Sequence, residues 1–173
     1  VSSFSVLPHQ QAFVQFKRDL RALGKIHSII STGPCDLKSR YGGIFFYGIH
    51  QVDMIINLLG VDLGHAQIIR GAKDNHIGVL TYRDGTTATM NLIGSGSPVF
   101  HLSAIGEKGR IDREISFDAN TYLTGTRTFC RMFKTGKKSE TVESMLAPVA
   151  SLEALEKSIK RNSRVVVSNK LSI

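Results

Sequence analysis

The chain has 173 residues, a length that fits one domain with a core of its own. Hydrophobic residues make up 42% of it and charged residues 21%, which is ordinary for a soluble globular protein. No apolar run reaches the length of a membrane span, so we expect no association with a membrane; no signal-peptide pattern is seen either.

The net charge of +8 indicates an affinity for anions. The basic residues are scattered, however, and no platform of interleaved aromatic residues accompanies them, so we expect no nucleic-acid partner. One modest cluster, which we expect to be a solvated surface, comprises Arg127, Arg131, Lys134, Lys137 and Lys138.

Two cysteines, Cys35 and Cys130, lie far apart and outside any pattern typical of zinc ligands. They therefore indicate neither a disulfide scaffold nor a metal site. A reducing compartment is the natural setting for such a chain, and we expect it to be cytoplasmic.

An irregular lead-in, residues 1–7, precedes a predicted amphipathic helix that begins at Pro8. Its apolar positions recur with helical spacing at Phe13, Phe16, Leu20 and Leu23. Gly24 is placed as the residue that ends the helix, and a strand through Ile30 follows.

Residues 31–43 are predicted to be a loop, because Ser, Thr, Gly, Pro and Asp cluster there. Asp36, Lys38 and Arg40 give this loop polar reach directly before the most apolar stretch of the chain. Loops in such positions often contact substrates, although plain solvent exposure explains each of these residues equally well.

The stretch from Gly42 to Gly60 predicts a buried helix that ends at the second glycine. Its three polar residues, His50, Asp53 and Asn57, are spaced so that they fall on one face of the helix. A polar stripe on a core helix costs free energy unless its groups find partners, and function is one reason to carry it. A histidine satisfied within the core is the alternative, which periodicity alone favours.

Five strand-like runs follow the helix, at Ala66–Gly71, His76–Tyr82, Thr86–Ile93, Val99–Ile105 and Arg110–Ile115. Asp84-Gly85 gives the strongest hairpin signal. The glycine-rich residues 94–98 lack the Lys-Ser/Thr of a phosphate loop, so we interpret them as a linker between strands.

The last third of the chain is predicted to contain one or two strands within 117–133, then a turn at 135–138. A helix over 144–162 and an extended run over 164–167 close the chain. The predicted fold class is α+β, with an open, mostly antiparallel β-sheet and helices packed on one face. We divide the chain into a lead-in and connecting helix (1–24) and an α+β domain (25–173).

The run GGIFFYGIHQVDMIINLLG resembles the signature helix of the Gfo/Idh/MocA oxidoreductases, in their C-terminal substrate domain. That family typically reads Gly-Gly-Gly, two apolar residues, Asp-x-Gly-x-His-x-x-Asp, an apolar run and a closing Gly. Gly48, His50, Asp53 and Gly60 match at the right spacing. Weaker similarities extend the resemblance from Leu23 to Val167.

The resemblance implies the substrate-binding and oligomerisation domain of an oxidoreductase that acts on a sugar, an inositol or a related polyol. NAD or NADP would bind to a separate nucleotide domain, so no cofactor is expected on this chain. His50 would be the catalytic proton-transfer residue, and Asp53 would orient the helix or the imidazole. A homodimer or tetramer through the open sheet face is also implied. The residues expected to bind substrate are Asp36, Lys38, Arg40, Tyr47 and Asp53.

The chain also departs from the family pattern. It has neither the glycine-rich nucleotide turn nor the Glu-Lys-Pro motif, and Phe46 stands where a carboxylate is expected. Val1 does not look like a natural start, so we expect the chain to be a fragment. The parent would use His50 alone, recruit Asp36, or do no redox chemistry; in that last case this is a ligand-sensing or dimerisation domain whose His50 helix is structural.

Overall fold

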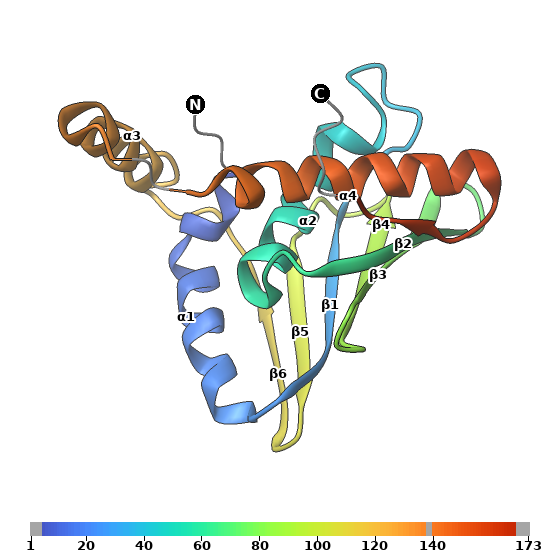
Figure 1. The fold of residues 1–173 in the computed structure, drawn as a ribbon, viewed down its shortest axis with the longest axis horizontal. Helices are drawn as coiled ribbons and strands as arrows, with labels where there is room; N and C mark the ends of the chain where they lie inside the picture. The colour runs from blue at the N-terminus through green and yellow to red at the C-terminus, as the bar shows by residue number, and fades with distance from the viewer. Residues whose placement is uncertain (1–4, 138–139, 169–173) are drawn as a thin grey trace.

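The computed structural model describes residues 5–137 and 140–168 of the chain (Figure 1). The helices within these residues are η1 (Leu7–His9), α1 (Gln11–Asp19), η2 (Leu20–Leu23), α2 (Ile44–Leu59), α3 (Leu123–Thr135) and α4 (Val142–Arg161). The strands are β1 (Ile26–Pro34), β2 (Leu63–Arg70), β3 (Asn75–Tyr82), β4 (Thr87–Ile93), β5 (His101–Gly106), β6 (Gly109–Glu114) and β7 (Val165–Val166). The α+β class and the open, mostly antiparallel sheet predicted from the sequence are confirmed.

The seven strands form one sheet in the order β6-β5-β1-β4-β3-β2-β7. The first strand, β1, is inserted between β4 and β5, so the consecutive strands β4 and β5 are not neighbours. It runs parallel to β4, with Ile29 opposite Ala88, and antiparallel to β5, with Ile29 opposite Ala104. Every other pair in the sheet is antiparallel.

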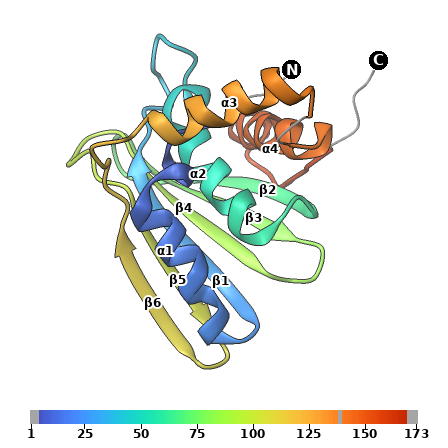
Figure 2. The same cartoon turned by 90° about the vertical axis from the view of Figure 1, so that its left-hand side faces the viewer.

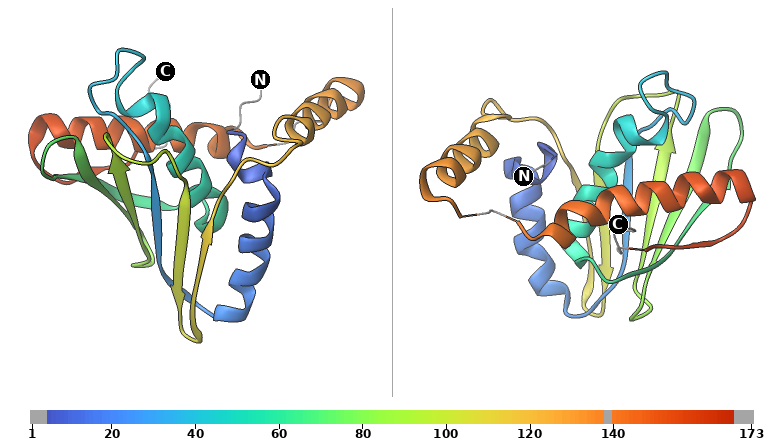
Figure 3. Two further views of the ribbon diagram at one scale, coloured as in Figure 1. Left: turned by 180° about the vertical axis from the view of Figure 1, so that it is seen from behind. Right: turned by 45° about the horizontal axis from the view of Figure 1, so that its top comes forward.

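One face of the sheet carries the core and the other is open. Side chains alternate along β1, so that Ile29 and Ser31 are buried beneath the helices while Ile30 and Thr32 lie half-buried on the opposite face. Helices α1, α2 and α4 lie on the core face (Figure 2). Seen from behind, the strands stand in front of α2 and α4 (Figure 3, left).

Helices α2 and α4 pack closely where α2 has a glycine. A Cβ atom on Gly48 would lie 2.9 Å from Cγ1 of Ile44, 3.3 Å from Cδ2 of Leu152 and 3.4 Å from Sγ of Cys35. The missing side chain therefore lets the two helices approach each other, as dense interior packing requires. Gly60 ends α2 with a φ of 86°, which glycine adopts without strain, as predicted.

The predicted strands within residues 117–133 are wrong, because the segment forms helix α3 instead. Its many threonines favour a strand by propensity. In the structure their hydroxyls donate to carbonyls one turn back, from Thr126 to Tyr122 at 2.9 Å and from Thr128 to Thr124 at 3.0 Å. The helix projects away from the body (Figure 1).

The predicted loop at 31–43 is also wrong over its first four residues, because β1 continues to Pro34. Turn-forming residues are held extended by pairing with β4, in which Gly33 lies opposite Leu92 and Pro34 opposite Ile93. The pairing with β5 stops at Thr32. Proline is thus confined to a stretch with a strand on one side only, where its missing amide is tolerated.

The other predicted elements are present, with shifted ends. The helix predicted from Pro8 consists of η1, α1 and η2, and its four apolar positions are all buried. Among the described residues, no helix is long and apolar enough to cross a membrane. Cys35 is a buried free thiol and Cys130 an exposed one, and Lys138 of the predicted basic cluster lies outside the described residues.

Candidate functional site

A cleft of about 670 Å³ opens beside the polar stripe of α2, between this helix and the start of α4. We call it the His50 cleft. Its walls come from α2, from α4, from Ser5 before η1 and from the segment that joins α3 to α4. The lining residues are Ser5, Ile49, His50, Asp53, Ile56, Asn57, Gly60, Val61, Glu140, Thr141, Ser144, Met145, Pro148 and Val149.

The predicted polar stripe faces this cleft. His50, Asp53 and Asn57 all line it, at successive turns of one helix. Asn57 donates its side-chain amide to the backbone carbonyl of Asp53 at 2.9 Å, which fixes the stripe at its far end. The cost of placing polar groups on an apolar helix is therefore offset by hydrogen bonds and by access to the cleft.

Ser5 joins the two ionisable residues of the stripe. Its Oγ lies 2.7 Å from Nδ1 of His50, and its backbone amide donates to Oδ2 of Asp53 at 3.1 Å. The Oγ also accepts from the amide of Leu7 at 3.4 Å, which leaves the hydroxyl proton for Nδ1. Among the described residues, none forms a hydrogen bond with Nε2 of His50.

Burial shifts the proton affinities of the groups in the cleft. It lowers the pKa of His50, so the imidazole is neutral at neutral pH. Burial also raises the pKa of Asp53 to about 6; the amide of Ser5 opposes this shift, and the charge of Glu140 adds to it. The pKa of Glu140 is itself raised by burial.

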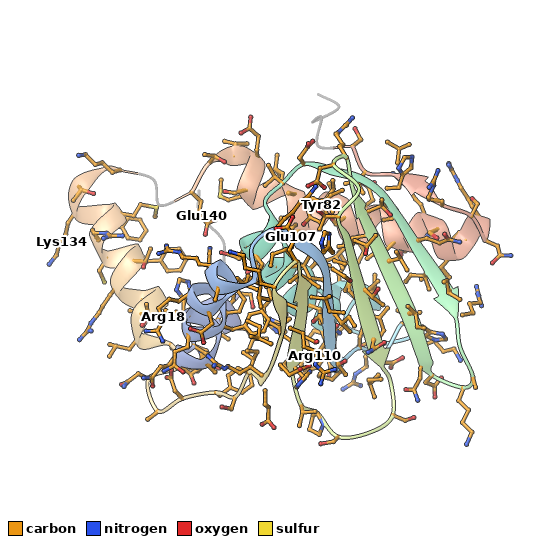
Figure 4. All side chains as sticks on the ribbon, turned by 90° about the horizontal axis from the view of Figure 1, so that it is seen from below. Arg18, Tyr82, Glu107, Arg110, Lys134 and Glu140 are labelled. Carbon is orange, nitrogen blue, oxygen red and sulfur yellow. The ribbon has the colours of Figure 1, made fainter. Side chains whose placement is uncertain are left out.

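Two carboxyl groups thus face a cleft in which none of the described lining residues is a lysine or arginine, although the chain carries a net charge of +8. Figure 4 shows Glu140 between α3 and α4, and Lys134 out on the projecting α3. Hydroxyl groups of a polyol can donate to such carboxylates. A neutral imidazole beside them can accept a proton. No cluster of three or more metal-ligating side chains occurs among the described residues.

The residues expected to bind substrate are not all in one place. Asp53 lines the His50 cleft, and the ring of Tyr47 lies 5.9 Å from that of His50, centroid to centroid. The loop residues are engaged elsewhere. Asp36 accepts from the amide of Lys38 at 2.8 Å, Lys38 forms an exposed ion pair with Asp74 at 3.6 Å, and the guanidinium of Arg40 lies over its neighbour Tyr41 at 4.7 Å.

Four polar residues of the cleft escaped the sequence analysis: Ser5, Glu140, Thr141 and Ser144. Thr141 caps α4 by accepting from the amide of Ser144 at 3.1 Å, a pattern that the spacing of the two residues could have revealed. Ser5 carried no such signal, because it sits in an irregular segment 45 residues before its partner His50.

A row of aromatic rings reaches His50 from the other end of α2. Consecutive ring centroids lie 5.0 Å apart from Tyr41 to Phe46 and 4.8 Å from Phe46 to Tyr47. Beyond His50 the row continues at 5.8 Å to Phe100 and 6.4 Å to Phe117. We call these five rings the aromatic row: Tyr41, Phe46, Tyr47, Phe100 and Phe117.

Solved structures with a similar fold include dehydrogenases. A scyllo-inositol dehydrogenase from Lactobacillus casei with bound NAD(H) and scyllo-inositol aligns with a TM-score of 0.78 at 16% identity, over 95% of this chain and 64% of its own. A myo-inositol dehydrogenase from the same organism, in complex with NAD(H) and myo-inositol, gives 0.75 at 14% identity, over 99% and 63%. A protein of Sinorhizobium meliloti 1021, provisionally assigned as a myo-inositol dehydrogenase, gives 0.79 at 15%, over 95% and 64%.

The chain shares the fold of these dehydrogenases. It spans 63–64% of the length of each of the three. No family model and no curated protein sequence matches the chain. The similarity is therefore one of architecture, and it agrees with the C-terminal dehydrogenase domain that the signature helix resembles.

Proposed function

We propose that this chain is the substrate-binding and oligomerisation domain of an NAD(P)-dependent oxidoreductase of the Gfo/Idh/MocA type. Its substrate would be a sugar, an inositol or a related polyol. The observation that carries the proposal is His50, which stands at the signature position of α2, lines a cleft and is held at Nδ1 by Ser5. A merely structural histidine would not need a 670 Å³ cleft beside it.

In this proposal the nicotinamide supplies the hydride chemistry in the parent protein. This chain has no glycine-rich dinucleotide turn, so its residues fit the proton transfer and the binding of substrate but not the cofactor itself. Oxidation of a carbinol to a carbonyl removes a hydride from carbon and a proton from oxygen. The residues of the His50 cleft would deal with the proton.

His50 is suited to that task because its lowered pKa keeps the imidazole neutral and able to accept. A proton taken at Nε2 creates a cation beside Asp53 and Glu140, whose negative charges would stabilise it. Ser5 fixes the ring from the opposite nitrogen, so Nε2 keeps one orientation toward the substrate. In this proposal Asp53 occupies its signature position in α2, and Glu140 adds a second carboxylate from outside that helix.

The test is a substitution in the parent oxidoreductase, with the nucleotide domain present. We expect His50→Ala to lower kcat by about 10²–10⁴-fold, the contribution of one general acid or base. Exogenous imidazole would restore part of the lost rate. Unchanged turnover together with lower stability would instead favour a ligand-sensing or dimerisation domain with a structural His50 helix.

The open face of the sheet supports the oligomeric part of the proposal. It exposes Ile69, Ile77, Ile105 and Val166 alongside threonines and other small polar side chains. An open sheet face with isoleucines in the solvent is suited to association with another copy. A homodimer or tetramer through this face is therefore proposed.

A further inference from the structure

Four of the five rings in the aromatic row are too exposed to be part of the core. Tyr41 is 59% exposed, Phe46 43% and Tyr47 41%, although aromatic side chains ordinarily supply core area. At its far end Phe117 is 55% exposed, and only Phe100 is buried. Tyr41, Phe46 and Tyr47 are neighbouring exposed rings, and contiguous apolar surface marks a binding site more often than scattered single residues do.

The row is continuous with the proposed active site. Phe46, His50, Asp53 and Asn57 are spaced i, i+4, i+7 and i+11, so they form one face of α2. On that face Phe46 lies in the first turn, Asp53 and Asn57 lie in the later turns, and His50 lies between them. A ligand that covers the whole face must be polar at one end and must offer a flat apolar surface at the other.

We propose that the aromatic row is a second sugar subsite, so that the ligand is a glycoside of at least two rings. One ring would occupy the His50 cleft and the next would lie against Phe46 and Tyr41. This rests on the proposed function, which makes the first ring a sugar or polyol. The polarised C–H groups of a pyranose face are attracted to the electron-rich faces of aromatic rings.

The angles between the rings favour a sugar over a planar base. Neighbouring rings are tilted by 36° at Tyr41–Phe46, 74° at Phe46–Tyr47 and 59° at Tyr47–His50, so none of these pairs forms a parallel slot. The row instead presents separate platforms with polar groups around them. The guanidinium of Arg40 donates to the hydroxyl of Tyr41 and lies over its ring, which holds that platform in place.

The second subsite also accounts for the departure at position 46. A carboxylate there would bind hydroxyl groups of the first ring, but it offers no surface for stacking. Phenylalanine removes that hydrogen-bonding group and supplies a platform one helical turn before His50. The position would thus serve the second ring rather than the first.

The test is cofactor-free calorimetric titration of this chain with cellobiose, maltose, methyl β-glucopyranoside and myo-inositol. We expect at least one disaccharide to bind about threefold to tenfold tighter than the single-ring probes, as one aromatic contact of this kind provides. Phe46→Ala should abolish that preference. Phe133→Ala is the matched control, because this ring is 80% exposed on α3, outside the row.

Phe46→Leu guards against loss of folding, because it keeps an apolar side chain and removes only the ring. Loss of the preference in this folded variant supports the proposal. Equal affinity for one and two rings in the unmodified chain would overturn it, as would a preference that survives both substitutions. If another copy of the chain covers the aromatic row, Phe46→Ala should change the oligomeric state and no disaccharide should bind. That result would also overturn the proposal.

These outcomes are separate from the fate of the proposed function. Binding is measured without nicotinamide, so the disaccharide preference can hold even if the parent shows no dehydrogenase activity. Conversely, His50→Ala can abolish turnover in the parent while Phe46→Ala leaves the choice of ligand unchanged. In that case the enzyme assignment stands and the second subsite is rejected.

Discussion

Ser5 Oγ lies 2.7 Å from Nδ1 of His50 and so ties the segment before η1 to the middle of α2. The same residue binds Asp53 through its backbone amide. One residue thus orients the proposed proton acceptor and one of the carboxylates beside it. Since the backbone contact does not depend on the side chain, the two contacts can be separated by mutation.

Ser5→Ala should remove the contact with Nδ1 and keep the one with Asp53. We expect kcat of the parent enzyme to fall by about tenfold, because the imidazole loses its fixed orientation. The free energy of unfolding should fall by only about 1 kcal/mol, the net contribution of one hydrogen bond. Kinetics across pH and urea denaturation provide the two measurements. A drop in stability with normal kinetics would contradict the positioning role.

Asp53→Asn should stabilise the chain at neutral pH. The carboxyl pKa is raised from 3.8 to about 6 in the folded state, so the folded protein binds the proton more tightly than the unfolded chain. Stability from this group is fully present below about pH 4 and is lost as the pH rises through 6. We expect a gain of up to about 2 kcal/mol at pH 7.5, after allowance for partial exposure, and little at pH 4.

Urea denaturation of Asp53→Asn and of the unmodified chain, at pH 7.5 and at pH 4, tests this prediction. Asp62→Asn is the control, because that carboxylate forms an exposed ion pair with Arg83 and lies outside the cleft. If Asp53→Asn is less stable than the unmodified chain at pH 7.5, burial is not the origin of the raised pKa of Asp53. The same substitution should slow turnover, because it removes a charge that stabilises protonated His50.

Gly48→Val should destabilise the chain strongly. The new side chain would meet Ile44 and Leu152 at distances shorter than ordinary contact, and α2 and α4 would have to separate. We expect a loss of about 2–3 kcal/mol, typical of overpacking a dense interface. Lys134→Val on the exposed side of α3 introduces the same β-branched residue without the clash. Thermal unfolding of both variants would reveal whether the loss is specific to position 48.

Ile77→Lys should prevent association through the open sheet face. Ile77 is 39% exposed on that face. In a symmetric contact between two copies, the ammonium group of the new lysine would be buried without a partner of opposite charge. Sedimentation velocity should show a monomer where the unmodified chain forms a dimer or tetramer. Val14→Lys, on α1 away from that face, should leave the oligomeric state unchanged. If the unmodified chain is a monomer at every concentration, the proposed assembly is rejected.

Much of the fold could be predicted because local signals agreed with tertiary structure. The helix at Gly42–Gly60 and the Asp84-Gly85 hairpin are such cases, since spacing, capping and turn residues all point the same way. Helix α3 could not be predicted because its threonines favour a strand by propensity. In the structure the hydroxyls of Thr126 and Thr128 donate to backbone carbonyls one turn back in the helix. Strand propensities do not include such hydrogen bonds.

The candidate site also contains residues that could be predicted from the sequence and residues that could not. His50 and Asp53 could be placed in a common stripe because both belong to one helix with a fixed period. Ser5 and Glu140 reach the cleft through tertiary contacts from distant segments, and a single sequence contains no signal of such contacts. Lys38 and Arg40 were predicted from their position before a functional helix, but position along the chain does not decide where a side chain points.

The insertion of β1 between β4 and β5 also constrains how the sheet is assembled. Strands β2, β3 and β4 are joined by short turns and can pair as soon as they are made, whereas β1 finds its partners only after residues 87–106 exist. The ribosome therefore delivers β1 before both of its neighbours in the sheet. During synthesis Ile29 therefore has no strand to pair with until β4 and β5 have been made. Bringing β1 together with these strands closes a long loop of chain, and the entropic cost of closing it should make the docking of β1 the slow step of folding.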